Sequence, residues 1–121
     1  MHRGYRIAVI ESDELIRQLV ERWLTDAGHS VLVRTPSSLR PGDVLDLVLA
    51  NVANPRAAAG PLRALQALNA APVLLVSARI RRGLAPSSRL AAQLGVRGVL
   101  PKPFTRDELL AAVEAALNDS L

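Results

Sequence analysis

Five short apolar runs in this chain lack helical spacing, and longer segments of mixed polarity separate them. Runs of this kind are typical of strands that are buried on both faces of a parallel sheet. The pattern predicts strands over residues 6–10, 31–33, 47–51, 72–78 and 96–100. The run 47–51 has an unusual end, because it stops at an amide, Asn51, where a buried strand would remain apolar.

The segments between the runs carry helical periodicity or helix-end signals. From Leu15 to Leu24, apolar residues recur at i, i+1, i+4, i+5, i+8 and i+9, which predicts an amphipathic helix with Gly28 as its C-terminal cap. The other predicted helical segments are a turn or two around 37–40, a helix over 62–68 with Pro61 at its first position, a short helix over about 88–94 closed by Gly95, and a last helix opened by the capping box 105–108.

Five strands alternate with five helical segments in 121 residues. This alternation predicts an α/β fold, a doubly wound parallel sheet with helices on both faces. We expect a single domain over residues 1–121, because no linker, repeat or low-complexity segment interrupts the pattern.

Composition excludes several classes of site and location. The chain has no cysteine, so it has no disulfide framework, thiolate metal site or cysteine nucleophile. No apolar run approaches the roughly 18 residues of a membrane span. The first residues lead directly into a strand pattern and not into a signal-peptide core, so we expect a cytoplasmic protein without a membrane partner.

The net charge of +4 is weak evidence for a nucleic-acid partner. The 15 basic residues are spread among 11 acidic ones, and the one tight cluster is Arg79, Arg81 and Arg82. The chain has one Trp, one Tyr and one Phe, too few aromatic rings for a base-stacking platform. We therefore expect surface basicity and no nucleic-acid binding by this domain.

Polar residues stand at the predicted strand ends, where open α/β sheets place their ligands and chemistry. They are Glu11, Ser12 and Asp13 after the first strand, Asn51 after the third, Ser77 after the fourth and Lys102 after the fifth. The carboxyl ends of parallel strands meet at one edge of the sheet, so these side chains are expected to converge there.

With these residues in place, the chain resembles the receiver domain of two-component response regulators over about residues 5–118. The matching segments are 7–17 (IAVIESDELIR), 46–55 (DLVLANVANP), 72–78 (PVLLVSA) and 95–104 (GVRGVLPKPF). The resemblance implies a flavodoxin-like sheet of order 2-1-3-4-5 and a cis peptide bond between Lys102 and Pro103.

In that family a histidine kinase transfers a phosphoryl group to an aspartate at the end of the third strand. The reaction needs an anionic oxygen as nucleophile and Mg²⁺ held by carboxylates. Here the acceptor position is Asn51, and Ser12 stands in the second place of the acidic pair after Glu11. Ser77 and Lys102 fit the family pattern, whereas Val99 stands at the switch position where the family usually has an aromatic ring.

A charge count extends this comparison. The usual site has three carboxylates and one lysine, a net charge of −2, whereas Glu11 and Lys102 sum to zero. We therefore expect Mg²⁺ to bind weakly or not at all, no resident cofactor, and an ion pair from Lys102 to Glu11 or a contact with the Asn51 carbonyl oxygen. The resemblance then implies a pseudo-receiver that is no enzyme and works through protein–protein interaction, independently of phosphorylation.

Alternatives remain open at this point. Asn51 and Ser77 can be hydrogen-bonding strand ends, and Ser12 and Asp13 can be helix caps. Asp13 or Ser12 could serve as a non-standard phosphoacceptor, or the emptied pocket could bind a small ligand or anion with help from the Arg79 loop. The partner could be a histidine kinase, another signalling protein, or a second copy that docks through 88–94, the fifth strand and the last helix, a face that would carry Arg89, Arg97 and Arg106.

Overall fold

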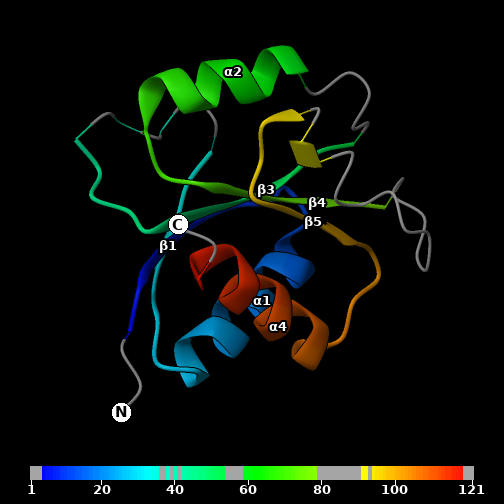
Figure 1. Cartoon of the computed structure of the whole chain (residues 1–121). Coiled ribbons are helices and arrows are strands. Elements are labelled where there is room, and N and C mark those ends of the chain that lie inside the picture. Colours follow the sequence, from blue (N-terminus) through cyan, green and yellow to red (C-terminus); the bar gives the residue numbers. More distant parts are fainter. Residues whose placement is uncertain are drawn as a thin grey trace.

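A computed structural model describes residues 4–35, 38, 40, 42–53, 59–78, 91–92 and 94–118. Its five strands form one all-parallel sheet in the order β2-β1-β3-β4-β5, which confirms the predicted fold class and strand order (Figure 1). The strands are β1 (Arg6–Ile10), β2 (Ser30–Val33), β3 (Leu47–Asn51), β4 (Val73–Ser77) and β5 (Gly98–Pro101). The helices that the structure bounds are α1 (Glu14–Asp26), α2 (Ala59–Leu68) and α4 (Arg106–Asn118).

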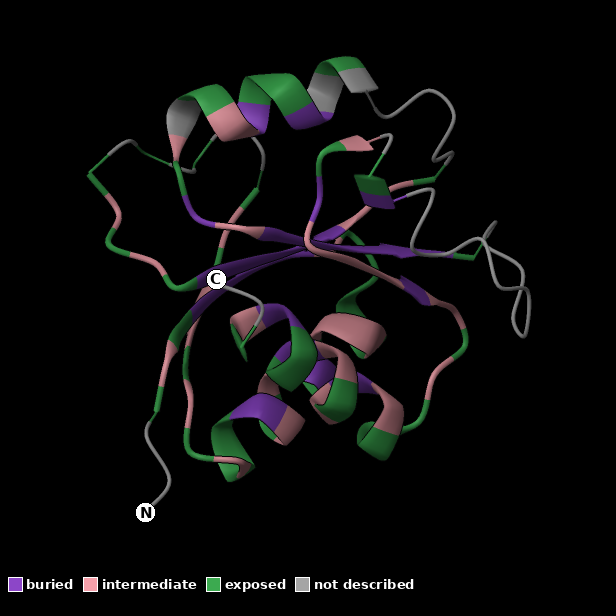
Figure 2. Ribbon diagram, viewed as in Figure 1, coloured by how far each residue is buried: buried purple, intermediate pink, exposed green. Residues whose placement is uncertain are grey.

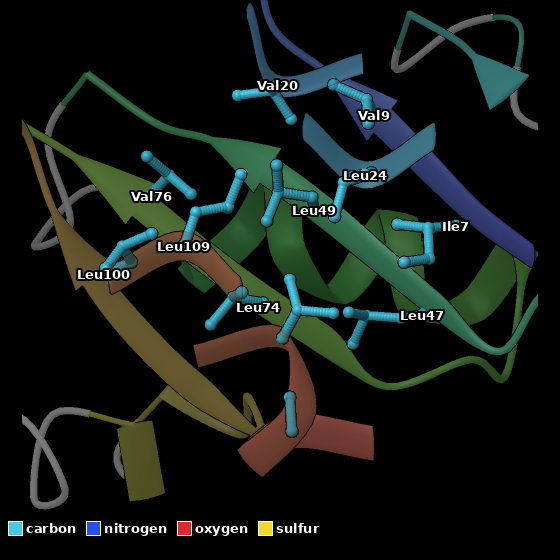
Figure 3. Close-up of a cluster of buried hydrophobic side chains, with 12 residues drawn as sticks. Ile7, Val9, Val20, Leu24, Leu47, Leu49, Leu74, Val76, Leu100 and Leu109 are labelled. Carbon is cyan, nitrogen blue, oxygen red and sulfur yellow. The ribbon is translucent and has the colours of Figure 1, made fainter. Parts of the chain in front are cut away.

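The sheet separates two hydrophobic layers, because successive side chains of a strand point to opposite faces. α2 covers one face, and α1 and α4 cover the other (Figure 1). Strand residues that face α2 are Ala8, Ile10, Val48, Ala50, Val73 and Leu75. Strand residues that face α1 and α4 are Ile7, Val9, Leu47, Leu49, Leu74, Val76 and Leu100 (Figure 3). The central strands are therefore buried on both faces, as their continuous apolar runs predict (Figure 2).

The caps of α1 follow the sequence signals. Asp13 is the N-cap residue, and its Oδ1 accepts a hydrogen bond from the backbone N–H of Ile16 at 3.1 Å. At the other end Gly28 has a φ of 96°, and the N–H groups of Gly28 and His29 donate to the carbonyl oxygens of Thr25 and Leu24. This pair of bonds is a Schellman motif, which favours glycine at the left-handed position.

Two further predicted helix ends are present. In the capping box, Thr105 Oγ1 accepts the Glu108 N–H at 3.1 Å, and Glu108 Oε1 accepts the Thr105 N–H at 2.9 Å. Gly95, with a φ of 70°, closes the helical residues before it, since the N–H of Val96 donates to the Ala91 carbonyl oxygen. The rest of the helix predicted over 88–94, and half of the turn predicted over 37–40, lie outside the described residues.

Some predicted bounds were wrong by one to three residues. The fifth strand was predicted over 96–100 and begins only at Gly98, because the N–H of Val96 is taken by the preceding helical turn. It extends to Pro101, which is tolerated because β5 is an edge strand. α2 begins at Ala59, ahead of the predicted start, since Pro61 still lies in the first turn, where N–H groups need no helical partner.

The carboxyl group of Asp43, in the connection between β2 and β3, makes a contribution to stability that depends on pH. Its pKa lies below the usual value, first because Oδ2 accepts the backbone N–H of Arg40 at 3.0 Å. Burial acts in the opposite direction, and the Arg34 guanidinium, with Nε 3.5 Å from Oδ2, lowers the pKa further. A lowered folded pKa means that this carboxylate stabilises the fold above the unfolded value of about 3.9 and that this stabilisation is lost as the pH falls through the folded pKa.

We expect Arg34→Gln to raise the Asp43 pKa only part of the way to its ordinary value, because the Arg40 N–H bond remains. The measurement is a carbonyl-detected NMR titration of Asp43, with Arg34→Lys as the control that keeps the charge. An Asp43 pKa that does not move in Arg34→Gln, or that returns fully to the ordinary value, would contradict this assignment of causes.

No helix within the described ranges has both the length and the apolar character needed to cross a membrane.

Candidate functional site

The register of the sheet brings four strand ends to one edge. Ile10 pairs with Ala50, so the next residues along these strands, Glu11 and Asn51, stand side by side at the carboxyl edge. Asn51 pairs with Val76, and Ser77 pairs with Pro101. Neighbouring strands lie about 4.8 Å apart. Glu11, Asn51, Ser77 and Lys102 therefore lie at one edge of the sheet, as predicted.

An ion pair between Glu11 and Lys102 crosses this edge. Lys102 Nζ lies 2.6 Å from Glu11 Oε1, and the two residues are 91 positions apart in the sequence. The Glu11 side chain is 5% exposed and that of Lys102 is 13% exposed, so both charges are largely removed from water. The second carboxylate oxygen of Glu11 accepts the backbone N–H of Asp13 at 3.0 Å. Both oxygens of the Glu11 carboxylate are thus engaged within the protein.

Ser12 and Asp13 lie on the solvent side of that ion pair. Both residues are exposed, and Asp13 directs Oδ1 to the first turn of α1 as its N-cap. The capping interpretation of Asp13 is therefore confirmed. Ser12 precedes the cap and keeps its hydroxyl at the exposed rim of the site.

Asn51 and Ser77 end two neighbouring central strands. Asn51 is half-buried and is the last residue of β3, and the N–H of the following Val52 donates to the Val76 carbonyl oxygen. Ser77 is the one fully buried polar residue among those described. No buried side-chain nitrogen or oxygen in the described segments lacks a hydrogen-bond partner. Ser77 is therefore a satisfied polar strand end, which agrees with the structural interpretation of this residue.

Val99, at the switch position, pairs with Leu75 across the β4–β5 ladder. It is partly buried and packs against the hydrophobic layer on the α2 side of the sheet. A valine offers neither a ring nor a hydroxyl to a neighbouring phosphoryl group. Its described surroundings are those of a packing residue.

The donor set does not fit a Mg²⁺ site. Mg²⁺ requires near-octahedral oxygen ligands and is held mainly by carboxylates. Of the two carboxylates that follow β1, Asp13 is the N-cap of α1, and Glu11 already has one of its oxygens on Lys102. Within the described part of the chain, no group of three or more His, Cys, Asp or Glu side chains is placed to hold a metal ion.

Several predicted residues cannot be placed. Arg79, Arg81, Arg82 and Arg89 lie outside the described residues. Arg97 is half-buried, and its Nη1 donates to the Ala116 carbonyl oxygen at 2.8 Å, which joins β5 to α4 within the domain. Arg106 is exposed at the start of α4. The proposed docking face therefore has one arginine committed to an internal bond and one at the surface.

A groove beside Lys102 was not predicted from the sequence. It has a volume of about 420 Å³ and lies between α1 and the segment that follows β5. The residues that line it include Ile16, Leu19, Trp23, Lys102, Pro103 and Phe104. The sequence signal was the pair Trp23 and Phe104, which are two of the three aromatic residues in the chain.

Solved structures with the same arrangement of strands and helices include a chemotaxis protein and a response regulator. The chemotaxis protein CheY4 of Vibrio cholerae superposes with a TM-score of 0.76 at 19% identity, over 95% of this chain and all of that one. A response regulator from Thermotoga maritima superposes with a TM-score of 0.77 at 18% identity, over 95% of this chain and 98% of that one. The chain has the fold of these proteins.

Sequence comparison agrees with this fold. The chain is 29% identical over 119 residues to the transcriptional regulatory protein CpxR of Escherichia coli K12, over 95% of this chain and 50% of CpxR. The domain thus spans half the length of that relative. The non-phosphorylated HemR receiver domain of Leptospira biflexa superposes with a TM-score of 0.74 at 22% identity, and 95% of each chain is covered. No protein-family model matches the chain.

The chain also has the cis peptide bond between Lys102 and Pro103 that the resemblance implied.

Proposed function

We propose that this receiver-like domain acts in two-component signalling without being phosphorylated and without enzymatic activity, through contact with a protein partner. The observation that carries the proposal is the pairing at the sheet edge. Asn51 stands where the family has its acceptor carboxylate, and the neighbouring Glu11 is held by Lys102.

The chemistry of the site supports this proposal. The amide of Asn51 is uncharged and a very poor nucleophile, so the attack on a phosphoryl group lacks its anionic oxygen. Catalysis of phosphoryl transfer is mainly positioning and charge neutralisation by cations. Lys102, the cation closest to this chemistry, is already neutralised by Glu11 at 2.6 Å.

The partner surface is part of the same proposal. In a domain without a switchable site, binding relies on surfaces that are present all the time. Arg106 is exposed at the start of α4, whereas Arg97 is held by Ala116. We propose a signalling protein as the partner, such as a histidine kinase, and a second copy of the chain as an alternative partner on the same face.

The test is incubation with acetyl phosphate and Mg²⁺, followed by intact-mass spectrometry. We expect no added phosphoryl group on the wild-type chain, because no free carboxylate faces the site from β3. The variant Asn51→Asp with Ser12→Asp, treated in parallel, controls for the activity of the phosphodonor.

The competing function is a phosphoreceiver with a non-standard acceptor. The observation in its favour is that Ser12 and Asp13 are both exposed at the rim of the site. One added phosphoryl group on the wild-type chain would overturn the proposal. Repeating the reaction with Ser12→Ala and with Asp13→Asn would then identify the acceptor.

A further inference from the structure

We propose that the groove between α1 and the segment after β5 binds a small, uncharged molecule with an apolar body. This inference goes beyond the proposed function, since it concerns a ligand and not phosphorylation or a protein partner. It rests on the size of the groove, its lining and its charge.

The size of the groove fits a small molecule. Its volume is about 420 Å³, within the range of about 300–1,000 Å³ that is typical of small-molecule sites. A helix of a partner protein is about 10–12 Å across with its side chains, so this hollow could admit no more than a few of its side chains.

The lining is apolar and aromatic. Ile16, Leu19 and Trp23 supply one wall from successive turns of α1, and Pro103 and Phe104 supply the other. The Trp23 and Phe104 rings meet edge to face with centroids 6.5 Å apart. Both rings are only partly buried, and Leu19 is 41% exposed. A hollow lined mainly by apolar and aromatic side chains with a single polar group is typical of small-molecule sites.

The charge of the groove selects a neutral ligand. Among the described residues that line the groove, Lys102 is the one that carries a charge, and its ammonium is neutralised by the Glu11 carboxylate at 2.6 Å. An anionic ligand would lose its hydration without gaining a net opposite charge, and it would lie close to Glu11. An ammonium group has three N–H donors, so one acceptor on a neutral ligand can bond to Lys102 while the ion pair persists.

Two matched dyes test this proposal in the whole chain. N-phenyl-1-naphthylamine is neutral, and 8-anilinonaphthalene-1-sulfonate adds a sulfonate to the same skeleton. The readout is energy transfer from Trp23, the single tryptophan of the chain, which lines the groove. We expect saturable binding of the neutral dye, at least threefold tighter than that of the anionic dye. The net charge of +4 would give the opposite order for nonspecific binding.

A pair of variants on α1 locates the binding. Leu19 lines the groove, whereas Leu15, one turn earlier and 68% exposed, does not belong to the lining. Because both side chains are exposed, Leu19→Glu and Leu15→Glu should fold alike. We expect Leu19→Glu to weaken binding of the neutral dye at least tenfold and Leu15→Glu to change it less than twofold.

Four outcomes would overturn the proposal. The first two are linear, unsaturable uptake of the neutral dye and tighter binding of the anionic dye. The third is an equal effect of the two glutamate variants on dye binding. The fourth is a loss of dye binding at high protein concentration, together with dimer formation observed by sedimentation. The last outcome would assign the groove to a second copy of the chain. None of them changes the intact-mass result, so the proposed function and this inference fail separately.

Discussion

Lys102→Met should be the most destabilising of the single substitutions considered for this domain, with a loss of about 3 kcal/mol in the free energy of unfolding. The change removes the partner of Glu11, whose side chain is 5% exposed, and so leaves a carboxylate charge largely cut off from water. Breaking a buried ion pair by removing one member typically costs 3–5 kcal/mol. We place the expected loss at the lower end because the pair lies at the sheet edge and Lys102 keeps 13% exposure.

The two members of the pair should respond unequally. Glu11→Gln leaves an ammonium that is closer to the surface and can move toward water, so the loss should be smaller than for Lys102→Met. It still removes one of two acceptors, since Oε1 faces Lys102 and Oε2 faces the Asp13 N–H. The double variant carries no buried charge and should recover at least half of the stability that Lys102→Met loses.

Urea unfolding of the four proteins in this cycle is the measurement, and the loss in Lys102→Met corresponds to roughly 10 °C in melting temperature. A matched control is Arg22→Met, which breaks an ion pair on the outer face of α1. The side chains of Arg22 and Asp26 are 80% and 59% exposed, and Arg22 Nε lies 4.0 Å from Asp26 Oδ2. The free energy of unfolding should therefore change by no more than about 0.5 kcal/mol. Equal midpoints for Lys102→Met and Arg22→Met would show that the pair at the sheet edge contributes nothing to stability.

Asn51→Asp alone should restore phosphorylation poorly, and Ser12→Asp added to it should do better. The first change supplies a nucleophilic carboxylate beside Glu11, and the net charge of Glu11, the new carboxylate and Lys102 becomes −1. Lys102 is then shared between two carboxylates, which leaves little negative charge for a dication. The second change brings the net charge to −2 and offers Mg²⁺ a further hard oxygen.

Two measurements follow this series. Mg²⁺ titrations monitored by backbone amide NMR should show affinity on the order of tenfold higher in the double variant than in Asn51→Asp. Acetyl phosphate with Mg²⁺ should give a larger phosphorylated fraction by intact mass in the same order. Ser12→Asp alone is the control, because it adds a carboxylate without an acceptor in β3. Saturation of the wild-type chain at physiological Mg²⁺ would refute the charge argument from which both expectations derive.

The bounds of a strand could be predicted where polar residues stand at its ends. β3 was predicted at its observed bounds because Asp46 and Asn51 flank an unbroken apolar run. The predicted start of β5 was wrong because the N–H of Val96 donates to the preceding helical turn. The pattern of apolar residues does not show that hydrogen bond. The capping box and the glycine at the end of α1 were predictable because each depends on a few neighbouring residues.

The site was predictable in part for the same reason. Strand-end position, residue charge and the resemblance limited the predicted partner of Lys102 to Glu11 or the Asn51 carbonyl oxygen, and the structure forms the pair with Glu11. The groove was not predictable, because Trp23 and Phe104 are 81 positions apart and meet only when α1 packs beside the segment after β5. A helical pattern assigns Trp23 to the core, whereas the structure leaves it partly buried in the lining of the groove.

The ion pair between Glu11 and Lys102 also sets the order in which this domain can be completed during synthesis. The strand that carries Glu11 is made first, and its partner is added 91 residues later. A nascent chain that has emerged only as far as β4 holds a carboxylate with no counter-charge at the sheet edge. The lysine that neutralises this carboxylate arrives directly after β5, and α4, which covers one face of the sheet, is made later still, so both the neutral site and the finished core depend on the C-terminal part of the chain.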